Sequence, residues 1–262
     1  MTARFLIEQM QTAQRDHGTC IVGLSGGSTP RLMYEEIGKA LRMALHPNPL
    51  PPLGHELVAR DPEGFSDPER GVEWRGEGIH IFLVDERYVP PDHPESNQRM
   101  VRETLLQHLP LPEKNLTFPN TNLQIDACVA DYARRLKALW KYRLPDLIIL
   151  GMGTDGHIAS LFPPLSDLAL GDTCLVLHTR APEGIGPPDA RDRITLSLNA
   201  ICAADKQVLL LQGEEKKRAW EEMLSPLSCR SGRGDGGEGQ WPLKRVIATG
   251  NLTVIGPATA TA

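Results

Sequence analysis

The segment Leu150–Pro163, LGMGTDGHIASLFP, places an aspartate and a histidine two residues apart in a glycine-rich stretch. Its three glycines predict a tight loop that brings Asp155 and His157 close together. A histidine titrates near neutral pH and can serve as a general base, and a nearby carboxylate can orient its ring. The pattern therefore predicts a catalytic base at His157. The alternative is a loop histidine beside an aspartate that serves only the turn.

A second glycine-rich turn, Gly23–Pro30, follows an apolar run. A Ser or Thr directly before a Pro is typical of a helix start, where unpaired amides and the helix dipole favour an anion. We expect Gly26, Gly27, Ser28 and Thr29 to hold a phosphate or an oxyanion, with a plain strand–turn–helix corner as the alternative. The lysine of a phosphate-binding Walker loop and the GxGxxG spacing of a dinucleotide site are both absent.

Charged residues follow a third apolar run, at Asp85, Glu86 and Arg87. Open α/β sheets bind ligands just outside the carboxyl ends of their strands, so these charges could lie at a site. The alternative is a solvated loop with an internal ion pair, which contributes little. Arg193 and Lys216 are most simply surface charges. Beside a phosphate site, however, the pair would form a cationic clamp.

The elements that must position these residues are short apolar strands with helical patterns between them. Nearly continuous apolarity predicts strands buried on both faces, as in a parallel sheet. The strands are expected at Thr19–Ser25, Ile79–Asp85, Asp146–Gly151, Thr173–His178 and Gln207–Gln212. Helical spacing is found at Ser96–Leu109, Gln124–Arg143 and Glu214–Leu224. This alternation predicts an α/β fold with a doubly wound, mainly parallel Rossmann-like sheet and helices on both faces.

Length and composition limit the possible classes of protein. The length of 262 residues fits one large α/β domain or two small ones. The net charge of −5 argues against a nucleic-acid partner or a membrane surface. We expect a single domain over residues 1–262, with inserted Pro/Gly-rich loops at about 46–78 and 228–240, and a monomer or weak homo-oligomer. No apolar run is long enough to cross a bilayer, and no signal peptide is expected.

The five cysteines are scattered and form no CxxC pair, which argues against a disulfide framework or a zinc site. Cys20, Cys174 and Cys202 lie in apolar segments, so we expect them to be buried. A reducing cytoplasm is the expected compartment. We expect no metal and no cofactor.

Taken together, the motifs resemble the 6-phosphogluconolactonase family, within the glucosamine/galactosamine-6-phosphate isomerase superfamily. The resemblance runs from about Ile21 to Trp220 and is carried by SGGSTP, DERYVPPDHPESN, LGMGTDGHIASLFP, RITLSLNAI and LLLQGEEK. It implies a Rossmann-like sheet. It also implies hydrolysis of 6-phospho-D-glucono-1,5-lactone to 6-phospho-D-gluconate, in the oxidative pentose phosphate pathway.

The resemblance also implies residue roles. His157 would activate water against the lactone carbonyl, Asp155 would orient His157, and Arg87 would lie beside the substrate and help to govern charge. The substrate phosphate would be bound by Gly26, Gly27, Ser28, Thr29, Arg193 and Lys216.

Two other functions stay open. Amino-sugar-phosphate deaminases of this superfamily carry a Glu five residues beyond the histidine, next to a Pro, where this chain has Phe162 before Pro163. A non-catalytic sugar-phosphate-binding paralogue would keep the pocket and would not need the base. The C-terminal tail, Thr253–Ala262, lacks the acidic or aromatic residue that usually ends the family's chains, which puts the last strand in doubt.

Overall fold

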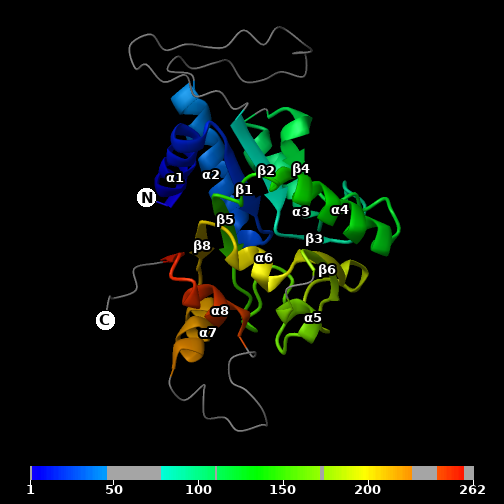
Figure 1. The fold of residues 1–262 in the computed structure, drawn as a ribbon. Coiled ribbons are helices and arrows are strands. Elements are labelled where there is room, and N and C mark those ends of the chain that lie inside the picture. Colours follow the sequence, from blue (N-terminus) through cyan, green and yellow to red (C-terminus); the bar gives the residue numbers. More distant parts are fainter. Residues whose placement is uncertain (1, 46–77, 110, 172–173, 226–240, 257–262) are drawn as a thin grey trace.

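A parallel sheet of six strands forms the centre of the computed structural model, which describes residues 2–45, 78–109, 111–171, 174–225 and 241–256 (Figure 1). The strands lie in the order β4-β2-β1-β5-β8-β9. They are β1 (Cys20–Leu24), β2 (Ile79–Leu83), β4 (Leu116–Thr117), β5 (Leu147–Gly151), β8 (Lys206–Leu210) and β9 (Leu252–Ile255). The chain adds strands on one side of β1 and then on the other, so a topological switch point lies between β1 and β5.

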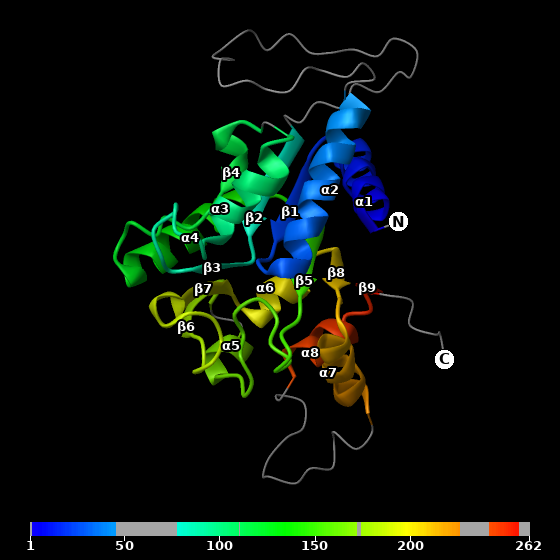
Figure 2. The same cartoon turned by 180° about the vertical axis from the view of Figure 1, so that it is seen from behind.

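The strands are apolar on both faces because helices cover both. Successive residues of β5 point to opposite sides: Ile148 joins one apolar cluster, and Ile149 joins the other. The first face is covered by α4 (Ile125–Leu139), α5 (Asp167–Leu170), α6 (Leu198–Cys202), α7 (Glu214–Leu224) and α8 (Pro242–Ala248). The second is covered by α1 (Thr2–His17), α2 (Ser28–Leu45) and α3 (Asn97–Val101), with α1 and α2 side by side (Figures 1 and 2). The predicted doubly wound α/β class is confirmed.

A smaller antiparallel sheet lies beyond the carboxyl end of β2. It consists of β3 (Asp85–Arg87), β7 (Asp192–Leu196) and β6 (Val176–Arg180), in that order. The prediction that Thr173–His178 forms a strand of the parallel sheet is therefore wrong. Only the start of β6 is buried, where Val176 and Leu177 join the cluster that contains α4. Because this short stretch is apolar, its sequence resembles that of a strand buried on both faces, although β6 is an edge strand.

Other predicted elements form with altered ends. The helix expected over Ser96–Leu109 divides into α3 and a π-helical turn, Arg102–Leu106. The last strand, which the composition of the tail put in doubt, is present as β9 and pairs parallel to β8. Cys20 is buried as expected, whereas Cys174 and Cys202 are partly exposed, which contradicts the prediction for those two. The predicted inserted loops at 46–78 and 228–240 lie outside the described residues, except Gly78.

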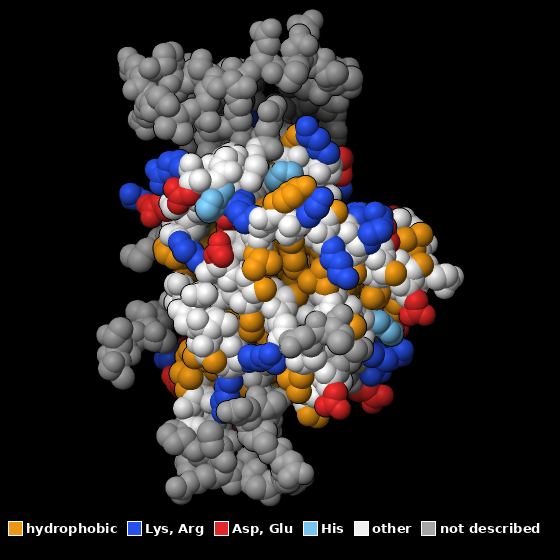
Figure 3. Space-filling view, viewed as in Figure 1, with side chains coloured by type: hydrophobic (Ala, Val, Ile, Leu, Met, Phe, Trp, Pro, Cys, Tyr) orange, Lys and Arg blue, Asp and Glu red, His pale blue; other side chains and the backbone are white. Residues whose placement is uncertain are grey.

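The surface carries mixed charge. Figure 3 shows basic side chains dispersed among acidic and apolar ones over one face rather than gathered in one continuous patch. Within the described ranges, no helix is both long and apolar enough to cross a membrane.

A buried tyrosine fixes the point where β2 ends and the chain turns toward β3. The Tyr132 hydroxyl of α4 donates to the Leu83 carbonyl at 2.5 Å and accepts from the Leu83 amide at 3.0 Å. Tyr132 is fully buried, so no water can replace either hydrogen bond.

Tyr132→Phe should lower the free energy of unfolding by about 1–3 kcal/mol, because it leaves the buried amide and carbonyl of Leu83 without their partner. Chemical denaturation measures the change. Tyr142→Phe is the matched control, since Tyr142 is 88% exposed. Equal stabilities of the two variants would contradict the role assigned to the Tyr132 hydroxyl.

Candidate active site

A cavity of about 230 Å³ lies at the switch point, between the carboxyl ends of the parallel strands and the smaller sheet. We call it the switch-point pocket. Six predicted site residues line it: Gly26, Gly27, Arg87, His157, Arg193 and Lys216. The side chains of Ser28 and Thr29 lie outside the described part of the structure. Asp155 does not line the pocket, but it contacts His157, which does.

The predicted His–Asp pair forms in the loop after β5. His157 Nδ1 lies 2.5 Å from Asp155 Oδ1. A carboxylate at this distance fixes the ring orientation and keeps the proton on Nδ1, so Nε2 is the nitrogen left for a proton transfer. The ring also packs against Phe162, with centroids 4.8 Å apart. Burial alone would raise the pKa of Asp155, but hydrogen bonds and the charge of His157 hold that pKa below its usual value.

Two glycines make this loop possible. A Cβ at Gly153 would overlap both the His157 ring and the Asp155 carboxylate, so only glycine leaves room for the pair. Gly156 has φ +84°, a left-handed conformation that favours glycine. The Gly153 amide also donates to the His157 carbonyl at 2.9 Å, which closes the loop.

The smaller sheet supplies a cationic wall. Arg87 of β3 and Arg193 of β7 occupy opposing positions in the antiparallel pair. Arg87 is held by Glu95, whose carbonyl accepts from Nη1 at 2.6 Å. Arg193 is only 3% exposed, and its Nε and Nη1 have no hydrogen-bond partner among the described residues. Burial and the nearby Arg87 lower the pKa of Arg193. Arg193 lines the pocket, and a guanidinium group there with donors that lack described partners is suited to an anionic ligand.

The turn after β1 provides backbone donors on another part of the pocket wall. Helix α2 begins at Ser28, so the amides of its first turn have no partners within the helix. A Cβ at Gly26 would collide with the Asn97 side chain, which explains the glycine there. The buried hydroxyl of neighbouring Ser25 also has no described partner. Together with the positive end of the α2 dipole, this wall favours an anion.

Lys216 lies in the first turn of α7, after β8. It lines the switch-point pocket, and its burial lowers the pKa of its amine. No ion pair joins Lys216 to a described carboxylate. This cation thus lines the pocket and is not neutralised by an ion pair within the described part of the chain.

Sequence reasoning missed Asp85 as a site residue. Among the three charged residues after β2, the resemblance assigns a role only to Arg87. In a strand, residues i and i+2 share a face, and Asp85 and Arg87 do line the same pocket while Glu86 is buried elsewhere. The alternative of a solvated loop is wrong, because Asp85 and Glu86 are both buried.

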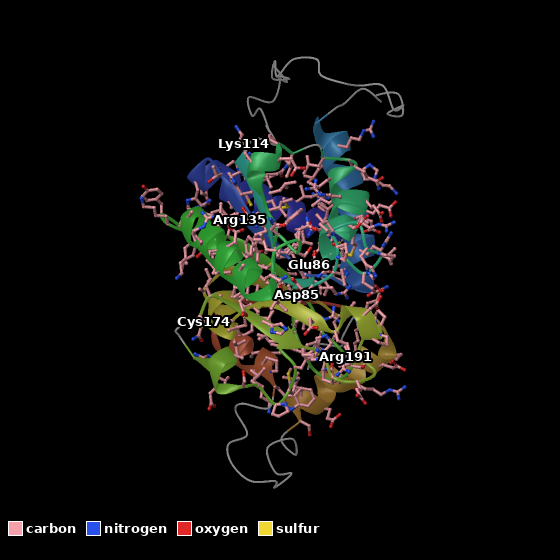
Figure 4. All side chains as sticks on the ribbon, turned by 90° about the vertical axis from the view of Figure 1, so that its right-hand side faces the viewer. Asp85, Glu86, Lys114, Arg135, Cys174 and Arg191 are labelled. Atoms are coloured by element: carbon pink, nitrogen blue, oxygen red, sulfur yellow. The ribbon has the colours of Figure 1, made fainter. Side chains whose placement is uncertain are left out.

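Glu86 lies beside Asp85 in the middle of the molecule (Figure 4), and its carboxylate joins two elements near the site. Its Oε1 accepts from the amides of Arg87 at 2.8 Å and Asn97 at 2.7 Å. Its Oε2 accepts from the amide of Gln98 at 2.8 Å and the hydroxyl of Ser96 at 3.2 Å. Burial raises the pKa of Glu86 to about 7, against the opposing effect of these hydrogen bonds. The carboxylate thereby ties β3 to the start of α3.

The described residues contain no group of three or more His, Cys, Asp or Glu side chains arranged to hold a metal ion.

The fold and the pocket define a class of α/β protein with a cationic wall and an aspartate-paired histidine at the switch point of a parallel sheet. Residues 56–254 match the family model described as glucosamine-6-phosphate isomerases/6-phosphogluconolactonase. The chain belongs to this family.

Named relatives are similar over most of the chain. The probable 6-phosphogluconolactonase of Dictyostelium discoideum is 30% identical over 237 residues, covering 89% of this chain and 82% of the relative. The 6-phosphogluconolactonase of Synechocystis sp. is 31% identical over 220 residues, covering 82% and 74%. The solved 6-phosphogluconolactonase from Plasmodium vivax aligns with a TM-score of 0.73 at 27% identity, covering 99% of this chain and 86% of that one.

Glu86→Gln should lower the free energy of unfolding by about 1–3 kcal/mol. Both carboxylate oxygens of Glu86 accept hydrogen bonds from backbone amides. In glutamine one of these oxygens becomes an NH₂ group, which cannot accept, so at least one backbone N–H loses its partner. Amide hydrogen exchange at Asn97 and Gln98 should accelerate. The isosteric control is Glu36→Gln on the exposed side of α2. Unchanged exchange at both amides would show that Glu86 does not anchor α3.

Proposed function

We propose that the chain hydrolyses 6-phospho-D-glucono-1,5-lactone to 6-phospho-D-gluconate, a step of the oxidative pentose phosphate pathway. The observation that carries the proposal is the presence, in one pocket, of the aspartate-paired His157 and the partnerless donors of Arg193. A base and an anion site together match a substrate with a reactive carbonyl at one end and a phosphate at the other. Membership of the family and the names of the relatives support the same activity.

The reaction needs little machinery because a lactone is an activated ester. His157 Nε2 takes a proton from water as the water oxygen bonds to the lactone carbonyl carbon. The carbonyl oxygen becomes an oxyanion, which the positive charge of Arg87 stabilises from the smaller sheet. The bond from that carbon to the ring oxygen then breaks. His157 returns its proton to the ring oxygen, and the open-chain acid is released.

The phosphate is assigned to the cationic side of the pocket. Arg193 supplies its guanidinium group, and Lys216 supplies a point charge. The turn over Gly26–Thr29 adds backbone amides at the start of α2. Ionic hydrogen bonds of this kind discriminate strongly between a phosphorylated and an unphosphorylated sugar.

Two alternatives are less well supported. The ring of Phe162 packs on His157 at the place where amino-sugar-phosphate deaminases, by resemblance, carry a Glu. Without that carboxylate, no side chain at this position can carry out the proton transfers that open the sugar ring. A non-catalytic binder would have no use for the 2.5 Å contact that orients His157.

We also propose that residues 1–262 form one domain that acts in the cytoplasm as a monomer or weak homo-oligomer. The two apolar clusters share the strands of one sheet, which supports a single domain. Among the described cysteines, Cys20, Cys128 and Cys202 are free thiols, which suits a reducing compartment.

His157→Ala should lower kcat for the lactone by about 10²- to 10⁴-fold, because it removes the general base. In the assay, glucose-6-phosphate dehydrogenase makes the lactone in situ and 6-phosphogluconate dehydrogenase reports the acid as NADPH. His178→Ala is the matched control, since His178 pairs with Asp192 away from the pocket lining. Ammonia release from glucosamine 6-phosphate is followed in parallel. Wild-type hydrolysis no faster than an enzyme-free blank would contradict the proposal.

Arg193→Ala and Lys216→Ala should each raise KM for the phosphorylated lactone by roughly 10- to 100-fold, the loss expected for a hydrogen bond to a charged group. KM for unphosphorylated D-gluconolactone should change far less. Arg180→Ala, at a side chain that is 62% exposed, serves as the control for a lost surface cation. Equal effects on both lactones would remove these residues from the phosphate site.

A further inference from the structure

We infer that Asp85 determines specificity for the polyol part of the substrate by accepting hydrogen bonds from sugar hydroxyls. The inference rests on the proposed function, since it assumes a sugar phosphate in the switch-point pocket. It assigns a ligand group to a pocket residue that the proposed reaction does not use.

Asp85 is placed to meet a ligand. It begins β3, and strand alternation puts its side chain on the same face as Arg87, toward the pocket. Asp85 is only 6% exposed, so bulk water competes little for its carboxylate. A ligand hydroxyl in the pocket can therefore form a hydrogen bond to it. Figure 4 shows Asp85 in the middle of the molecule, beside Glu86, where the larger and smaller sheets meet.

The carboxylate is held in a fixed orientation by one partner. Ser160 Oγ donates to Asp85 Oδ2 at 2.8 Å. Ser160 is itself anchored at both ends, because its amide donates to Thr195 Oγ1 at 3.3 Å and its carbonyl accepts from Thr179 Oγ1 at 2.8 Å. No described hydrogen bond engages Oδ1. The anchoring therefore leaves an oriented acceptor beside the pocket.

The charge of Asp85 identifies what it can accept from. The oxygens of a phosphate dianion carry no hydrogens to donate, and like charges repel, so Asp85 cannot share the phosphate with Arg193. Sugar hydroxyls are donors and match a carboxylate. A carboxylate within a cationic wall therefore marks the end of the pocket that holds the hydroxyls. It also sets the direction in which a phosphorylated sugar lies.

Calorimetry tests the inference without turnover, with 6-phosphogluconate and inorganic phosphate as ligands. Asp85→Asn keeps the shape and an acceptor for Ser160 but removes the charge. It should weaken binding of 6-phosphogluconate by about 10- to 100-fold, the range for a hydrogen bond to a charged group. Binding of inorganic phosphate should be unchanged or tighter, because a nearby negative charge is lost. The control is Asp92→Asn at an exposed position.

A second variant and the lactone assay separate the possible outcomes. Ser160→Ala removes a hydroxyl from the pocket lining and frees the Asp85 carboxylate. It should weaken 6-phosphogluconate binding less than Asp85→Asn and leave phosphate binding intact. If Asp85→Asn lost equal affinity for both ligands, Asp85 would act only by supporting Arg193, and the inference would be overturned. If the wild-type chain hydrolyses the lactone and Asp85→Asn binds 6-phosphogluconate as tightly as the wild type, the inference is overturned and the proposed function is not. A chain that binds 6-phosphogluconate through Asp85 but does not hydrolyse the lactone would overturn only the proposed function.

Discussion

The antiparallel pairing of β3 with β7 sets two guanidinium groups, Arg87 and Arg193, at opposing positions beside the switch-point pocket. Like charges placed this way repel, and Arg193 is almost completely buried with two donors that no described residue satisfies. Nearby carboxylates offset part of the cost, since Asp85, Glu95 and Glu86 all raise the pKa of Arg193 against the effect of burial. An anionic ligand would supply the rest. The smaller sheet thus holds a buried guanidinium group whose donors lack described partners, which favours an anion beside it.

The remaining elements place the His157 loop and the start of α2 beside these two arginines. The strand order places the ends of β1 and β5 side by side, so the amides at the start of α2 and the loop that carries His157 lie on adjacent walls. Gly153 leaves the space in which His157 and Asp155 meet. In the proposed reaction, the anion site orients the substrate and His157 beside it acts as the base.

Much of this arrangement could be predicted from the sequence because it is local. The apolar runs predicted β1, β2, β5 and β8, and the glycine-rich loop predicted the contact between His157 and Asp155. The antiparallel sheet could not be predicted this way, because the short apolar start of β6 imitates a buried parallel strand. The importance of Asp85 depends on its contact with Ser160, 75 residues away, which local patterns do not encode. The opposition of Arg87 and Arg193 likewise follows only from the pairing of β3 with β7.

A crystal structure of the complex with 6-phosphogluconate would test most directly how the pocket holds its substrate. The product carboxyl group should lie beside His157 Nε2, and the phosphate should lie about 3 Å from the donors of Arg193 and Lys216. Chain hydroxyls should face Asp85. A ligand in the reverse direction, with its phosphate against His157 and its carboxyl group on Arg193, would contradict the assignment of the two ends of the pocket. It would require a different base for lactone hydrolysis.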